Sequence, residues 1–133
     1  MNIAALALPD RVVKPLADYC MIAGRFGLAI LFMAGALQKA FAPEVTEQLL
    51  VLKGFPPAVI WPAMGGSAFG AACLMMGVWL GPMAFLLALY AIATSLFHYV
   101  PEDPIQMSIL VKNWAIAGGL LVLCAHEAMT PRR

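Results

Sequence analysis

Seven polar side chains interrupt long apolar stretches of this sequence, and their types limit the chemistry that the chain could perform. They are Arg25, Gln38, Lys39, His98, Gln106, Lys112 and Asn113. Amide, imidazole and ammonium groups donate or accept hydrogen bonds, so such groups could hold the polar head of a small ligand. They form no catalytic set, because no serine has a neighbouring base at a spacing that indicates nucleophilic catalysis. We therefore expect no catalytic residue and no enzymatic activity in the isolated chain.

Metal chemistry finds little support in the sequence. The three cysteines lie far apart in apolar stretches, and they are Cys20, Cys73 and Cys124. His98 and His126 belong to opposite ends of the predicted helices, so they cannot ligate one haem together. Cys73 and Met76 could share a helix face as soft Cu(I) ligands, but such residues are usually ordinary packing side chains. We expect no metal site and no intrinsic cofactor.

The composition indicates a chain surrounded by lipid. Of 133 residues, 63% are hydrophobic and 11% are charged, whereas a soluble domain is roughly half apolar and about a quarter charged. The mean hydropathy is +0.89. A net charge of +1 gives no basic surface that would attract a polyanion, so nucleic-acid binding is not expected.

The predicted fold is an all-α, integral-membrane antiparallel bundle of four transmembrane helices. Between Gly54 and Phe97 the sequence has no acidic, basic or histidine residue, and this stretch is long enough for two spans of about 20 residues each. Gly81 and Pro82 predict the break between these two helices, because glycine ends helices and proline opens them. The predicted spans are 19–41, 57–80, 82–100 and 105–126.

The two ends of the chain are predicted to lie on the cytoplasmic side. Residues 1–18 form an interfacial or cytoplasmic tail rather than a signal peptide, and residues 128–133 form a basic tail. The bundle proper covers residues 19–127. The basic residues that decide the orientation are Arg11, Lys14, Arg132 and Arg133 on the side of the termini, against Lys39 and Lys53 on the other. A multi-pass protein of the bacterial cytoplasmic membrane follows.

With these spans, six polar residues gather at the outer end of the bundle. They are Gln38, Lys39, His98, Gln106, Lys112 and Asn113. Several have a plainer interpretation, because lysine can snorkel to the interface and histidine can cap a helix. For Lys112 and Asn113, a ligand site and structural polar contacts are equally favoured. Arg25 is an intramembrane charge that could snorkel or join an ion network with Asp18 and Glu127.

Small residues mark predicted helix-packing sites. Without a hydrophobic driving force between helices in lipid, small side chains allow the close approach that holds helices together. The second span supplies Gly66 and Gly70, and the fourth supplies Gly118 and Gly119. We interpret these four glycines as packing contacts rather than as ligand contacts.

An ordered set of these residues resembles the DoxX family of small bacterial membrane proteins. The set consists of Arg25 with the apolar run to Gly35, Gln38-Lys39, Gly54-Phe55-Pro56, Gly70 to Gly77, His98, Gln106, and Lys112-Asn113 leading to Gly118-Gly119. The resemblance implies a four-helix bundle, and relatives are linked to quinol-oxidising and thiosulfate:quinone oxidoreductase complexes. One departure is Ser67, which stands where family members often carry a glutamate.

Two functions from different classes follow from these features. The first is a non-catalytic accessory or scaffold subunit of a larger membrane complex, of the quinone-linked redox kind that the resemblance implies. Its partners would be membrane lipid and other subunits or further copies of the chain. The second is a binding protein for a quinone or lipid at the outer end. A transporter component is less favoured, because no inverted repeat is evident.

Overall fold

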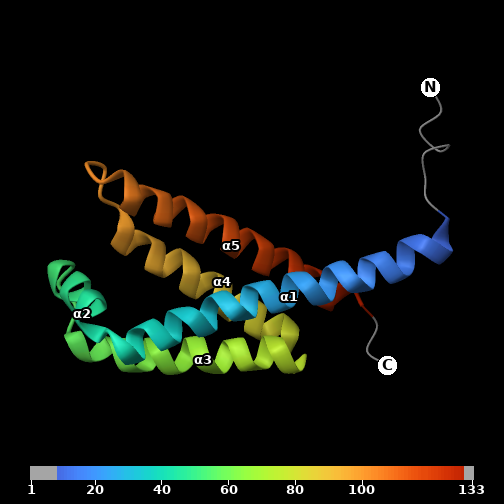
Figure 1. Ribbon diagram of the computed structural model, residues 1–133, viewed down its shortest axis with the longest axis horizontal. Helices are drawn as coiled ribbons and strands as arrows, with labels where there is room; N and C mark the ends of the chain where they lie inside the picture. Colours follow the sequence, from blue (N-terminus) through green and yellow to red (C-terminus); the bar gives the residue numbers. More distant parts are fainter. Residues whose placement is uncertain (1–8, 131–133) are drawn as a thin grey trace.

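The computed structural model describes residues 9–130, and every regular element in this part of the chain is helical. The elements are α1 (Asp10–Phe41), α2 (Pro43–Leu52), η2 (Pro57–Val59), α3 (Ile60–Met76), α4 (Leu80–Ser95), η3 (Leu96–His98) and α5 (Pro104–Met129) (Figure 1). Four segments of this region are long and apolar enough to cross a membrane, and they are Arg11–Phe41, Pro57–Met76, Leu80–His98 and Pro104–Met129. The predicted all-α class and the four long apolar helices are confirmed.

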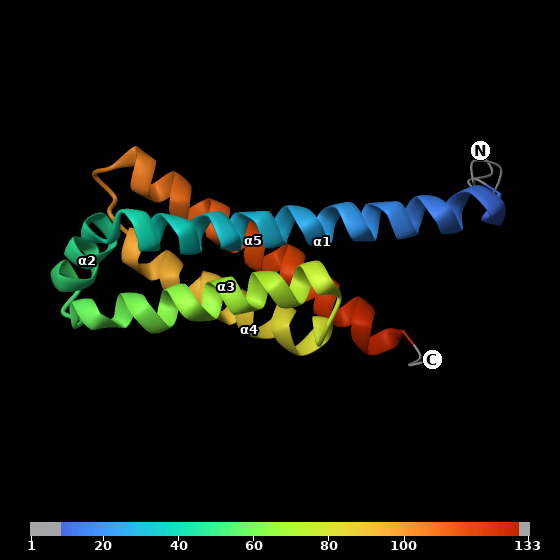
Figure 2. The same cartoon turned by 60° about the horizontal axis from the view of Figure 1, so that its bottom comes forward.

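The long helices pack as two pairs. α1 lies chiefly against α3, and α4 lies chiefly against α5, whereas fewer contacts join α3 to α4 and few join α1 to α5. Figures 1 and 2 show the α4–α5 pair running obliquely to the α1–α3 pair. The packing is therefore more uneven than the predicted four-helix bundle, in which each helix would contact its neighbours equally.

A thin core of small and aliphatic side chains joins the two pairs. Its buried members from the four long helices are Ala29, Phe32, Ala71, Leu74, Ala84, Leu87, Ala88, Ala91, Ala117, Leu120 and Leu123. Alanine is frequent here because it allows helix backbones to approach closely. The rings of Phe32 and Tyr90 add a contact between α1 and α4, with their centroids 6.3 Å apart.

The predicted break at Gly81-Pro82 is wrong by about one helical turn. α3 ends at Met76 because Gly77 adopts the left-handed conformation, with a φ of 73°, and its N–H bonds to the carbonyl of Cys73. α4 then begins at Leu80, so Gly81 and Pro82 lie within its first turn. A proline fits there, because the first N–H groups of a helix have no intrahelical partner.

The segment between the first two predicted spans, residues 42–56, contains a helix that the sequence analysis does not predict. Residues Pro43–Leu52 form the helix α2. Pro43 occupies its first turn and Glu44 complements the positive end of the helix dipole, while Leu50 is buried beneath it. Leu50 is the buried residue of this helix, and this anchor holds the short helix against the rest of the fold.

The predicted tail of residues 1–18 overlaps a helix. α1 is continuous from Asp10, with Pro15 inside it, and it has 32 residues. Figures 1 and 2 show its N-terminal part projecting beyond the other long helices. α5 likewise continues to Met129, past the predicted end at 126. The predicted tails therefore overlap the helices, and residues 1–8 and 131–133 lie outside the described residues.

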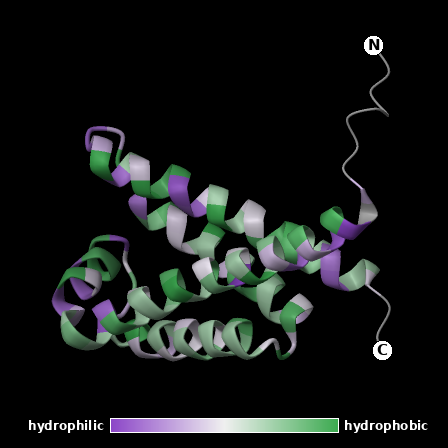
Figure 3. Ribbon diagram, turned by 45° about the vertical axis from the view of Figure 1, so that its right-hand side comes forward, coloured by the Kyte–Doolittle hydropathy of each residue, from purple (hydrophilic) through white to green (hydrophobic). Residues whose placement is uncertain are grey.

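Hydrophobic residues dominate the surface of the long helices. Figure 3 shows hydrophilic residues gathered mainly at the ends of the molecule, with a hydrophilic interruption part-way along α5. Exposed large apolar side chains are found on all four long helices, and examples are Ile30, Phe69, Leu89 and Val122. An exterior of this kind is typical of a chain whose solvent is hydrocarbon rather than water.

Candidate functional site

The most defined polar contact joins η3, which follows α4, to the start of α5. Nδ1 of His98 lies 2.7 Å from Oε1 of Gln106. Since that amide oxygen only accepts, Nδ1 must carry the proton and donate it, and in the neutral ring this leaves Nε2 as an acceptor. Both side chains are half-buried. This pair could accept a hydrogen bond from a ligand hydroxyl through Nε2 and donate one from the Gln106 amide.

Local sequence explains how these two side chains meet. Asp103 caps α5, because its Oδ1 accepts hydrogen bonds from the backbone N–H groups of Ile105 at 2.9 Å and Gln106 at 3.2 Å. Pro104 occupies the first turn. This cap fixes the rotation with which α5 begins, and it turns the Gln106 side chain towards the end of α4.

Contacts from the segment after α2 reach the same end of the molecule. The rings of Phe55 and Phe97 pack with their centroids 5.2 Å apart, and Nζ of Lys53 donates to the carbonyl of Tyr99 at 3.5 Å. The sequence analysis did not identify these contacts. They join residues far apart in the chain, and no local pattern signals such pairing.

The six predicted site residues do not form one cluster. Only His98 and Gln106 are joined; Nζ of Lys39 instead donates to the carbonyl of Gly35, one turn earlier in its own helix, at 3.0 Å. Gln38 is exposed. Lys112 is also exposed, whereas Asn113 is half-buried and lies seven residues after Gln106, on the same face of α5. The candidate site therefore reduces to His98, Gln106 and Asn113.

Arg25 lies beside the turn between α3 and α4. A Cβ atom added at Gly77 would lie 3.2 Å from Nη1 of Arg25. Its carbon Cζ is 5.7 Å from the centroid of the Phe26 ring, and its buried Nε has no hydrogen-bond partner. Among the described side chains, the expected ion network of Arg25 with Asp18 and Glu127 does not form.

The four predicted packing glycines divide into one internal contact and three exposed positions. A Cβ atom added at Gly70 would lie 2.7 Å from Cδ2 of Leu87, so this glycine allows α3 to approach α4. Gly66, Gly118 and Gly119 are exposed, and an added Cβ would meet nothing within 4 Å. These three glycines make no such contact within the described chain, so their packing role stays a prediction for contacts with other chains.

Ser67 has a structural role in its own helix. Its side chain is 2% exposed, and its hydroxyl donates to the carbonyl of Ala63 at 2.7 Å. The position at which the resemblance implies a glutamate is therefore buried. The one polar group of Ser67, its hydroxyl, has a hydrogen-bond partner in the same helix. Among residues 9–130, no group of three His, Cys, Asp or Glu side chains could hold a metal ion.

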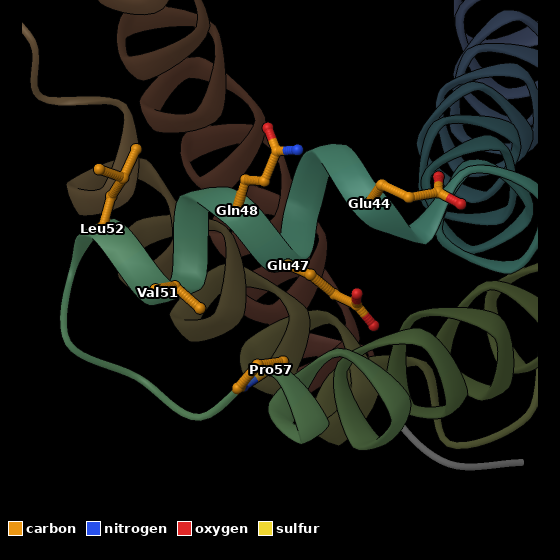
Figure 4. A pocket seen from close by; sticks show the side chains of 6 residues that line it. All are labelled: Glu44, Glu47, Gln48, Val51, Leu52 and Pro57. Carbon is orange, nitrogen blue, oxygen red and sulfur yellow. The ribbon is translucent and has the colours of Figure 1, made fainter.

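Two shallow surface grooves are found on α2 and on α5. One, of about 620 Å³, is bordered by α2 and the start of η2, and its side chains are Glu44, Glu47, Gln48, Val51, Leu52 and Pro57 (Figure 4). The other, of about 450 Å³, follows the exposed face of α5 along Met107, Ser108, Val111 and Lys112. Neither encloses the His98–Gln106 pair.

Comparisons with family models, with curated proteins and with solved structures find no match to this chain. The resemblance to the DoxX family therefore rests on the residues quoted for it and has no independent support.

Proposed function

We propose that this chain is a multi-pass protein of the bacterial cytoplasmic membrane, with both termini in the cytoplasm, and that it is a non-catalytic accessory or scaffold subunit of a larger membrane complex. The observation that carries this proposal is the length of α1. At about 1.5 Å per residue, the 31 apolar-rich residues Arg11–Phe41 extend for about 46 Å, whereas a hydrocarbon layer is about 30 Å thick. The 20 residues Pro57–Met76 match that thickness.

The projecting part of α1 has an apolar surface without a partner among the described residues. All residues from Arg11 to Cys20 are exposed. Val12, Leu16 and Tyr19 are 44%, 51% and 72% exposed, respectively. Apolar patches of this kind mark interaction surfaces. A helix from another membrane subunit would cover this surface and hold α1 in its continuous form.

The kind of complex follows from the resemblance rather than from the contacts. Members of the DoxX family are linked to quinone-linked redox complexes, and we propose such a complex as the partner. The oxidoreductase chemistry would then belong to the partner subunits.

A photo-crosslinking amino acid at position 16 tests this proposal in the native membrane. The matched control carries the same amino acid at position 89 on α4, where leucine is 48% exposed. We expect position 16 to crosslink to one protein that also co-purifies in stoichiometric amount under mild extraction, and position 89 to crosslink to lipid. Crosslinking of both positions to lipid alone, with recovery of the chain by itself, would contradict the proposal.

A second candidate function is supported by the His98–Gln106 contact. The amide N–H of Gln106 can donate to a quinone carbonyl at the end of an apolar bundle, and Nε2 of His98 can accept from the hydroxyl of a quinol or a lipid. Asn113, on the same face of α5, adds a further amide.

Binding of decylubiquinone to the purified chain, followed by tryptophan fluorescence, tests this second function. We expect Gln106→Leu to weaken binding by about fivefold, since one hydrogen bond contributes on the order of 1 kcal/mol. Gln38→Leu is the matched control, because Gln38 is exposed and lies outside the pair. Equal binding of decylubiquinone by both variants would show that the His98–Gln106 pair is not the binding site.

A further inference from the structure

The guanidinium group of Arg25 occupies a specific place at the end of the molecule where α3 turns into α4. It contacts Gly77, the residue that ends α3. The segments Pro57–Met76 and Leu80–His98, with 20 and 19 residues, meet at this turn. Since each is about as long as the hydrocarbon layer is thick, the turn lies at one surface of that layer. Arg25 is therefore at the depth of the lipid phosphates, not at mid-membrane.

The side chains around the turn support this depth. Trp79, within the turn, is 66% exposed, and tryptophan is enriched where membrane meets water. Trp79 also has a φ of 50°, which is unusual for a residue with a large side chain. The turn therefore holds an exposed indole ring at the level where headgroups are found.

The charge of Arg25 is only partly compensated by the protein. The C-terminus of α3 supplies a partial negative charge beside the guanidinium group. However, the buried Nε has no hydrogen-bond partner, and no carboxylate of the described side chains forms an ion pair with this residue. Arginine has five N–H donors that suit a phosphate or carboxylate; since Nε is buried, the four on Nη1 and Nη2 are the donors left for an external acceptor.

The other charged residues of α1 lie away from the guanidinium group of Arg25. Arg11 and Lys14 precede Arg25 by about four and about three helical turns, or about 21 and 17 Å along the helix axis, and Asp18 precedes it by about two turns. Glu127 lies against Gly81 in the first turn of α4, where an added Cβ would lie 3.5 Å from its own Cβ. Arg25 is therefore the basic residue of α1 that lies at the α3–α4 turn.

We propose that Arg25 binds the phosphate of an anionic phospholipid, in a site formed by α1 and the α3–α4 turn. The phosphate oxygens accept hydrogen bonds from the guanidinium group, and the acyl chains lie against exposed apolar residues such as Phe26 and Met76, which are 40% and 68% exposed. This inference rests on the membrane placement proposed above, but it does not depend on a partner subunit.

Thermal unfolding of the full chain in lipid nanodiscs tests the site. The midpoint Tm is measured in phosphatidylcholine, in an equal mixture with phosphatidylglycerol, and in phosphatidylcholine with inorganic phosphate. We expect phosphatidylglycerol to raise the Tm by on the order of 5 °C, as a ligand specific for the folded state does. Inorganic phosphate should leave the Tm unchanged. An equal rise with inorganic phosphate would identify a free-anion site and overturn the lipid assignment.

Two variants locate the effect. Arg25→Gln should abolish the rise, whereas Arg11→Gln should retain it, because Arg11 is exposed on the projecting part of α1. Arg25→Lys keeps the charge but loses the planar fork, so it should retain only part of the rise. A full rise in Arg25→Gln, or none in the wild-type chain, would overturn the proposal.

Native mass spectrometry of the wild-type chain makes the test independent of whether Arg25→Gln folds. Released from equal mixtures of the two lipids, the chain should retain phosphatidylglycerol in clear preference to phosphatidylcholine. Equal retention would also overturn the proposal. Since no partner protein is present in these experiments, their failure is distinct from a failure of the crosslinking test of the accessory-subunit function.

Discussion

The contact between Gly70 and Leu87 places a glycine where a larger side chain does not fit. A Cβ atom at position 70 would lie 2.7 Å from Cδ2 and 3.0 Å from Cγ of Leu87, and Leu87 is itself buried. We expect Gly70→Val to destabilise the chain by about 1–3 kcal/mol, because overpacking forces side chains and backbone to shift. Unfolding in detergent by denaturant measures this change.

Gly66→Val is the matched control at residue scale, since position 66 has no neighbour within 4 Å. Its effect on the isolated chain should stay within about 1 kcal/mol, as for exposed helical positions. Adding Leu87→Ala to Gly70→Val should recover part of the lost stability by removing the clash. Equal costs at positions 66 and 70 would show that glycine packing does not distinguish them.

The polar residues show what the sequence could and could not predict at this scale. The meeting of His98 and Gln106 was predictable, because a short loop joins two helices that both end there. The outward position of Lys112 and the exposure of Gly118 and Gly119 were not. α5 is apolar on nearly all sides, so its sequence gives no signal for which face packs on α4.

At the scale of elements, the turn between α3 and α4 depends on the backbone of Gly77. Its φ of 73° is accessible to glycine at little cost and is strained for alanine. We expect Gly77→Ala to destabilise the chain by about 1–2 kcal/mol. In the same variant the new methyl group would lie 3.2 Å from Nη1 of Arg25. Denaturant unfolding again provides the measurement.

Gly81→Ala provides the comparison, because Gly81 lies within α4, where an added Cβ makes only an ordinary contact at 3.5 Å. Alanine is the better helix former there, so this variant should be neutral or more stable by up to about 1 kcal/mol. If Gly81→Ala proved the more damaging of the two, the helix boundary would lie at Gly81-Pro82, where the sequence predicts it.

The capping of α5 gives another prediction for an element. Asp103 accepts two backbone hydrogen bonds through Oδ1, so Asp103→Ala should cost about 0.5–2 kcal/mol. Glu102→Ala, one residue earlier and exposed, should cost little. The NMR signals of the His98 ring should shift only in Asp103→Ala, because the cap also sets the rotation of Gln106. Unchanged His98 signals in both variants would show that the Asp103 cap does not position Gln106 against His98.

The same elements show how far pattern reasoning extends. Long runs of apolar residues predict the four long helices, because hydrocarbon requires every backbone group to be paired within a helix. They do not fix the ends. Both Gly77 and Gly81 could end α3 by residue type alone, and only the packing of Leu74 in the core and the left-handed Gly77 select the first. α2 was missed because its single buried anchor, Leu50, is not a periodic pattern.

At the scale of the whole molecule, the chain has two helix pairs, a thin core and one helix that extends past the rest. The pairs are linked mainly through α3 and α4, so the lines of small residues on the outer faces of α3 and α5 are left without partners inside the chain. In a membrane, such faces are suited to close helix contacts with other chains. We expect the projecting part of α1 to serve assembly with a partner rather than the stability of the chain itself.

Removing residues 2–18 tests that separation. Residues 11–18 are all exposed, and the buried core of α1 begins at Ala29, so the shortened chain should unfold within a few degrees of the full chain. Its association with a partner subunit should be lost, since the covered surface of the helix is gone. Co-purification from native membranes and thermal unfolding measure the two properties on the same preparation. A shortened chain that keeps its partner would place the contact on α3 or α5 instead. A large fall in Tm would show that the projecting segment stabilises the fold, and the length of α1 would then need no partner to explain it.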